Sequence, residues 1–240
     1  MSGTGVVAGE RPGRARPAPA QSRDKAAQKR WRRISHLGLW ALTLTPAVVT
    51  LVDTFTWNLG VDPIETLTHR TGWWAIVHLA ATLAVTPLRR LFGWHWLVRY
   101  RRQLGLGSFI YASLHLGVYA FLDLGLDFSH LAEDIIERPF ITVGFTSWLI
   151  LLALALTSTT ASMRRLGKRW TTLHRLVYIA AGLVSLHYIW GQKVLETQPL
   201  FFAVLFAVLL ASRVFYSWRK RRSRAGRGPV SGRAVVEPRS

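Results

Sequence analysis

The chain has 240 residues, of which half are hydrophobic and 18% are charged, and its mean hydropathy is +0.21. This balance excludes an ordinary soluble domain and is typical of a protein that crosses a membrane. The 31 Lys and Arg against 12 Asp and Glu give a net charge of +19, which in a soluble protein would indicate a nucleic-acid partner. We assign this charge instead to loops that border the membrane lipid, and we expect no nucleic-acid partner. The absence of cysteine excludes disulfides, iron–sulfur clusters and covalently attached haem.

The first 33 residues are rich in Arg, Ala, Pro and Gly, and residues 1–33 are therefore predicted to be a disordered basic tail. Six stretches without Asp, Glu, Lys or Arg follow, and most are long enough to cross the hydrocarbon core. They are residues 34–52, 71–88, 103–122, 139–163, 176–192 and 197–212. We therefore predict an all-α integral membrane protein with a six-helix transmembrane bundle over residues 34–218. A second basic tail is expected over residues 219–240.

The charges between the predicted helices indicate the orientation of the chain. Basic segments 1–33, 89–102, 164–169 and 213–240 together hold 27 Lys and Arg and only three acids, whereas loops 53–70, 123–138 and 193–196 hold nine acids and three basic residues. The positive-inside rule assigns the basic segments to the cytoplasm. We therefore expect a bacterial inner-membrane protein with both termini cytoplasmic, and a short interfacial helix within the outer loop 122–137.

Histidines within the predicted spans are the candidate site residues, because an ionisable group at membrane depth needs a partner or a function. His115 is expected about 18 Å along the third span and His187 about 25 Å along the fifth, so the two can meet in the outer half of the bundle. Between them we predict one b-type haem, with the second nitrogen of each imidazole hydrogen-bonded. His78 is assigned a helix-packing role.

A second haem is left open. His174 lies thirteen residues before His187 on the same predicted helix, about 20 Å nearer the cytoplasm. Where a partner on the third span would be expected, the chain has Arg101 and Arg102, which cannot ligate iron. His36 could reach this depth. The alternative for His174 is a hydrogen-bonding or single-ligand role beside a quinone or flavin, whose anionic groups the two arginines would attract.

Seven motifs recur in order along the chain and resemble the MsrQ family, also called YedZ, over about residues 30–215. They are Arg101-Arg102-Gln103-Leu104-Gly105-Leu106, Ala112-Ser113-Leu114-His115-Leu116, Arg138-Pro139-Phe140, Leu156-Thr157-Ser158-Thr159, Arg165-Leu166-Gly167-Lys168-Arg169-Trp170, Leu173-His174-Arg175-Leu176-Val177-Tyr178 and His187-Tyr188-Ile189-Trp190. The resemblance implies a haem-b-binding inner-membrane subunit with a transmembrane domain like that of ferric reductases. It implies haem ligands among His115, His174 and His187, and FMN as a further cofactor, for which Arg101 and Arg102 are our candidate contacts.

The resemblance also implies a pathway for electrons. The chain would receive them from the quinone pool or a cytosolic flavin reductase and pass them to MsrP, a periplasmic molybdopterin enzyme that reduces methionine sulfoxide. No dinucleotide-binding motif follows the last predicted span, so we expect an electron-transfer subunit without a catalytic centre of its own. The alternatives are a stand-alone ferric-reductase-like cytochrome b, a histidine-lined transporter, and a scaffold. We find no internal repeat that would support an inverted-repeat transporter.

Overall fold

The computed structural model describes residues 19–192 and 196–225, and every regular element in these ranges is helical. The α-helices are α1 (Pro19–Phe55), α2 (Pro63–Phe92), α3 (Arg101–Gly117), α4 (Phe128–Glu137), α5 (Pro139–Leu156), α6 (Thr160–Leu166), α7 (Lys168–Leu173), α8 (Val177–Trp190) and α9 (Thr197–Ala225). Two short 3₁₀ segments, η1 (His95–Tyr100) and η3 (His174–Leu176), and one π-helical segment, η2 (Val118–Asp123), join them. The predicted all-α class is confirmed for the described chain.

Five helical segments are long and apolar enough to cross a membrane, as judged over the described residues. They are Asp24–Phe55, Pro63–Phe92, His95–Asp123, Pro139–Leu156 and Thr197–Lys220. Together they identify an integral membrane protein. The fifth predicted span corresponds to α8, which has only 14 residues and is shorter than the roughly 20 that a full crossing needs. The count of six crossings and the orientation of the termini stay predictions.

Three boundaries differ from those expected. Helix α1 already begins at Pro19, so residues 19–33, which were expected to be disordered, are helical; they include good helix formers such as Ala, Lys, Gln and Arg. Helix α5 ends at Leu156 rather than continuing to 163. A separate helix, α6, begins at Thr160, and the Thr159 side chain caps it by accepting a hydrogen bond from the Ser162 amide. Helix α9 continues through the expected tail boundary to Ala225.

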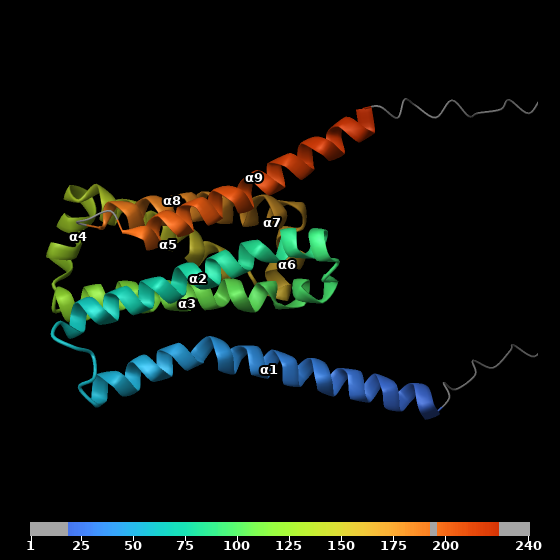
Figure 1. The fold of residues 1–240 in the computed structure, drawn as a ribbon, viewed down its shortest axis with the longest axis horizontal. Coiled ribbons are helices and arrows are strands. Elements are labelled where there is room, and N and C mark those ends of the chain that lie inside the picture. The colour runs from blue at the N-terminus through green and yellow to red at the C-terminus, as the bar shows by residue number, and fades with distance from the viewer. Residues whose placement is uncertain (1–18, 193–195, 226–240) are drawn as a thin grey trace, which may run out of the picture. The chain divides into compact units, whose positions relative to one another are not determined.

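The helical core is built from two pairs of packed helices. Helix α2 lies along α3, α5 lies along α8, and α9 packs on both α8 and α2 (Figure 1). Their contact buries side chains from four helices: Ile76, Leu79 and Leu83 of α2, Leu151 and Leu154 of α5, Ala180 and Ala181 of α8, and Phe202 and Phe206 of α9. The fully buried Ala180 and Ala181 have small side chains that allow helices to approach closely, as is common in membrane interiors.

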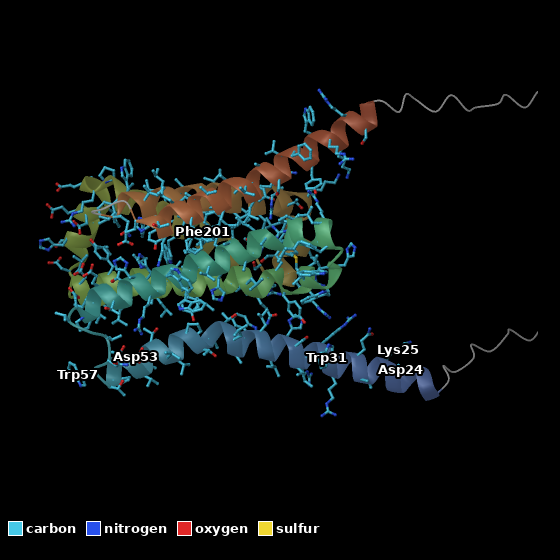
Figure 2. The ribbon with its side chains drawn as sticks, in the orientation of Figure 1. Asp24, Lys25, Trp31, Asp53, Trp57 and Phe201 are labelled. Carbon is cyan, nitrogen blue, oxygen red and sulfur yellow. The ribbon has the colours of Figure 1, made fainter. Side chains whose placement is uncertain are left out.

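Helices α2 and α4, which follow acidic loops, are each capped by an aspartate. Asp62 accepts the Glu65 amide at the start of α2, and Asp127 accepts the amides of Ser129 and His130 at the start of α4. Asp53 and Trp57 lie together where α1 ends (Figure 2), and Asp53 pairs with Arg70 at 2.5 Å. Helix α4 confirms the short helix expected within loop 122–137.

A hydroxyl group from α3 enters the backbone of α1 at a proline. Pro46 has no amide hydrogen and interrupts the hydrogen-bond ladder of α1. The Tyr111 hydroxyl donates to the Thr43 carbonyl oxygen at 2.7 Å and accepts from the Ala47 amide at 3.0 Å. These two backbone groups would pair with each other in a regular helix. Tyr111 thus satisfies both groups and attaches this part of α1 to α3.

Candidate functional site

A pocket of about 410 Å³ lies between the pair α2–α3 and the pair α5–α8, beside α4. Three histidines line it: His115 from α3, His187 from α8 and, at its exposed edge, His69 from α2. Most of its other walls are apolar, including Ile76, Leu79, Leu116, Phe140, Phe145, Trp148 and Leu151. An apolar cavity with a few convergent polar groups is the usual form of a cofactor pocket.

His115 is held by the helix on which α3 packs. Its Nδ1 lies 3.0 Å from the Thr68 carbonyl oxygen of α2, and since a carbonyl only accepts, Nδ1 carries the hydrogen. Gly72 gives the ring its space, because a Cβ atom at that position would lie 3.1 Å from His115 Nδ1. The neutral ring therefore keeps a lone pair on Nε2.

His187 is held in the same way on the other side of the pocket. Its Nδ1 donates to the Phe140 carbonyl oxygen of α5 at 2.8 Å, and the Phe140 ring stacks on the imidazole with 6.2 Å between ring centroids. A Cβ atom on Gly144 would come within 2.6 Å of His187 Nδ1, a distance that real Cβ contacts essentially never reach. Glycine at this position is therefore required for the observed ring position.

The two histidine sites are related by an internal repeat. Each acceptor stands 47 positions before its histidine, and each glycine follows its acceptor by one helical turn. The correspondence extends further along the helices. Ser108 donates to the Ala75 carbonyl, and at the equivalent positions of the second copy Ser147 donates to the Ala180 carbonyl. The pair α2–α3 and the pair α5–α8 thus present the same arrangement. The sequence gives only a weak sign of this repeat: besides the glycine, the clearest identity is Ser113-Leu114-His115, which recurs as Ser185-Leu186-His187.

The imidazoles of His115 and His187 are placed as two ligands of one metal ion would be. Their ring centroids are 6.1 Å apart, and their planes cross at 80°. Metal–imidazole bonds of about 2 Å put two opposed ligand nitrogens about 4 Å apart, which this centroid separation accommodates. Within the described chain no group of three or more His, Cys, Asp or Glu side chains is placed to hold a metal ion. Two neutral imidazoles in an apolar pocket fit as the residues that would hold a haem.

His174 does not belong to this pocket. It lies in the 3₁₀ segment η3, so it does not share a continuous α-helix with His187 as expected; α8 begins only at Val177. Its ring stacks on Trp170 with 4.0 Å between centroids, and its Nε2 lies 3.2 Å from the Thr157 hydroxyl oxygen. The structure therefore brings two of the three predicted ligands together and holds the third among polar and aromatic neighbours elsewhere.

The predicted arginine pair is divided between two environments. Arg101 is half-buried and interacts electrostatically with His174, whereas Arg102 is exposed. Consecutive residues of a helix point about 100° apart, so both side chains cannot serve the same face. Of the two, Arg101 is the one that lies near His174.

A polar group at the edge of the pocket was not identified from the sequence. The Tyr119 hydroxyl donates to the Asp134 carboxylate, and Arg138 Nε contacts the same carboxylate at 2.9 Å. Tyr119 and Arg138 both line the pocket. The Asp134 side chain is only 15% exposed, and the two donors satisfy it. This cluster connects η2 to α4 and shields one side of the pocket.

The chain resembles one family model and several known proteins. Residues 71–185 match the family model for the ferric reductase like transmembrane component. The protein-methionine-sulfoxide reductase heme-binding subunit MsrQ of Herminiimonas arsenicoxydans is 49% identical over 179 residues, which cover 73% of this chain and 80% of that protein. The subunit of the same name from Ralstonia nicotianae is 44% identical over 206 residues, covering 85% and 93%. No solved structure matches the chain.

Proposed function

Because the chain belongs to the MsrQ family of haem-binding subunits of protein-methionine-sulfoxide reductases, we propose that it binds one b-type haem between His115 and His187. The single observation that carries the proposal is the 6.1 Å separation of two imidazoles that are each oriented by a backbone carbonyl. Such carbonyl contacts fix the tautomer and raise the basicity of a ligating nitrogen. A bound haem would supply a one-electron couple at its iron.

The residues around the imidazoles would determine the polarity and rigidity of the surroundings in which the haem iron changes charge. Phe140, Phe145 and Trp148 give the pocket an apolar wall, and the Trp148 indole donates to Ser113, which fixes its position between α5 and α3. An apolar and rigid surrounding lowers the reorganisation that accompanies each change of charge. These properties would suit electron transfer by a haem that His115 and His187 hold.

The family and the position of the pocket support a proposal for the electron pathway. We propose an inner-membrane subunit with cytoplasmic termini that takes electrons from the quinone pool or a cytosolic flavin reductase and delivers them to a periplasmic, molybdopterin-containing MsrP-type subunit for repair of oxidised methionine. Support comes from the acidic residues beside the pocket: Asp123 lines it, and α4 borders it. By the charge rule this acidic side is the periplasmic one.

A flavin contact is proposed at the other end of the bundle. The guanidinium of Arg101 suits the phosphate of FMN in charge and hydrogen-bonding geometry, and His174 and Trp170 add a polar and an aromatic neighbour. Arg102 is exposed on a different face of α3, so within the predicted pair Arg101 is the better candidate. His174 remains a candidate ligand or hydrogen-bonding residue for a second cofactor.

Absorption spectroscopy tests the haem proposal directly. We expect the purified protein to show the reduced-minus-oxidised bands of a low-spin b haem, and His115→Ala and His187→Ala each to lose or convert that signal. His95→Ala, at an exposed position in η1, is the matched control and should keep it. A low-spin spectrum that is unchanged in both His115→Ala and His187→Ala would reject the ligand assignment.

A second candidate function is a stand-alone ferric-reductase-like cytochrome b, which the family-model match over residues 71–185 favours. The two functions differ in the acceptor. Reduced protein in nanodiscs should be oxidised quickly by an MsrP-type subunit and slowly by ferric chelates if the first function holds. The reverse order of rates would favour the second.

A further inference from the structure

Arg213 is a partly buried cation that the charge pattern assigned to the basic cytoplasmic segment 213–240. It lies on α9, and its guanidinium reaches back into the bundle to bond the Leu83 carbonyl of α2 at 2.7 Å and the Tyr178 hydroxyl of α8 at 2.5 Å. The same guanidinium lies 4.8 Å from the centre of the Tyr178 ring. Positive-inside signalling needs a charge at the membrane surface, so it does not explain an arginine held between three helices.

The partners of Arg213 do not neutralise it. Both hydrogen-bond acceptors are uncharged, and its Nε is buried with no hydrogen-bond partner among the described residues. The charged groups that interact electrostatically with Arg213 are two more arginines, Arg90 of α2 and Arg101 of α3. None of the four ion pairs in the described chain includes any of these three arginines. A buried charge without a counter-ion is strongly unfavourable.

The surroundings of the cluster indicate where a counter-ion would come from. Arg90 packs over the Tyr216 ring at 5.0 Å, one turn beyond Arg213 on α9, so α2 and α9 meet at the cluster. The residues that follow the two arginines are large, apolar and exposed: Leu91 and Phe92 after Arg90, and Val214 and Phe215 after Arg213. In a membrane protein such exposed apolar side chains face lipid. The cluster therefore borders the acyl chains and the headgroup layer.

We propose that Arg213 and Arg90 form a phosphate-binding site, whose ligand is the headgroup phosphate of an anionic phospholipid. Arginine recognises phosphate oxygens with paired N–H groups, and basic sites between transmembrane helices are a known form of lipid recognition. The apolar side chains beside Arg90 and Arg213 would hold the acyl chains of the same lipid. The site lies outside the haem pocket and does not depend on haem binding.

Thermal unfolding of the whole protein in nanodiscs tests the site, with tryptophan fluorescence as the signal. The parent protein should have a higher Tm in nanodiscs that contain phosphatidylglycerol than in discs of phosphatidylcholine alone, because a ligand that binds only the folded state stabilises it. Arg213→Gln should abolish this lipid-dependent gain, and Arg90→Gln should reduce it. Arg219→Gln removes the same charge from an exposed position of α9 and should leave the gain unchanged.

The increase in Tm caused by phosphatidylglycerol distinguishes lipid binding by Arg213 from a purely structural role of this residue. If Arg213 only fastens α9 to α2 and α8, Arg213→Gln lowers Tm equally in both bilayers, and the proposal is wrong. Equal gains in all variants, or no gain in the parent, would likewise overturn it. Inorganic phosphate or FMN added to phosphatidylcholine discs identifies the source. A gain there that depends on Arg213 would keep the phosphate site and replace the lipid by a soluble phosphate as its ligand.

Discussion

At the scale of single residues, two glycines decide whether the histidines can reach their acceptors. A backbone carbonyl in a helix is normally shielded by side chains of the next turn. At Thr68 and Phe140 the residue one turn later is glycine, and the imidazole occupies the space where its Cβ would be. The histidines could be predicted from their depth in the sequence. The glycines could not, because a sequence does not show which residue faces a neighbouring ring.

We expect Gly144→Ala to displace the His187 ring and to lower haem content. The new Cβ would lie 2.6 Å from Nδ1 and 2.7 Å from Cε1, so the ring must move away from the Phe140 carbonyl. Overpacking of this kind costs about 1–3 kcal/mol. Gly182→Ala, on α8, is the matched control because nothing lies within 4 Å of its Cβ position. Haem stoichiometry and the low-spin bands measure the effect; equal haem content in the two variants would contradict it.

At the scale of helices, Tyr111 of α3 bonds the backbone of α1 where Pro46 interrupts the helical hydrogen bonds. A mid-span proline in the sequence indicates a bend but not which side chain bonds the backbone groups that the bend separates. Tyr111 is 1% exposed, and its aromatic ring also stacks on His78 with 5.1 Å between centroids. His78 itself bonds the Trp74 carbonyl at 2.8 Å. These contacts support the packing role predicted for His78.

Tyr111→Phe should destabilise the protein while keeping its ring contacts. The change leaves the Ala47 amide and the Thr43 carbonyl without the bridging hydroxyl, and a buried group without a partner costs about 1–3 kcal/mol. Unfolding in mixed micelles gives the free energy. Tyr216→Phe, which keeps its ring beside Arg90, is the control.

A double-mutant cycle with Pro46→Ala identifies the cause. Alanine would remove the proline ring that interrupts α1 and allow the Ala47 amide to bond the Thr43 carbonyl directly, so Tyr111→Phe should cost less in that background. An unchanged cost in the Pro46→Ala background would show that the hydroxyl acts elsewhere.

At the scale of the whole molecule, charge and hydropathy predicted most of the architecture but not its irregularities. The apolar stretches gave the positions of five long helices, and the outer acidic loop was correctly expected to hold a short helix. The length of a stretch without charged residues does not show that Thr159 caps a new helix. It also does not show that the Arg213 side chain bonds groups of α2 and α8. Both depend on where one side chain finds its hydrogen-bond partner. Residues 1–18 and 226–240 of the two predicted tails lie outside the described residues.

The face of α4 that points away from the pocket is the docking surface that we propose for a basic electron acceptor. Leu131 and Ile135 line the pocket, whereas Glu133 and Glu137 are exposed on either side of Ile136, which is 80% exposed. Asp134 is bonded to Tyr119 and Arg138 and is not available to a partner. The two exposed glutamates are therefore the acids of α4 that can steer an acceptor toward the pocket.

Replacing these two acids together, Glu133→Gln with Glu137→Gln, should slow electron transfer to an MsrP-type subunit several-fold at low ionic strength. The difference from the parent should shrink as salt is added, because steering over more than a Debye length of about 10 Å is screened at 0.1 M. Reduction of the haem by its donor is the internal control, since the donor side carries no part of α4. Stopped-flow oxidation of reduced haem across a salt series measures the rate. Steering by α4 is refuted if variant and parent have equal rates at every salt concentration, and a defect that persists at high salt would instead place the glutamates in the bound interface.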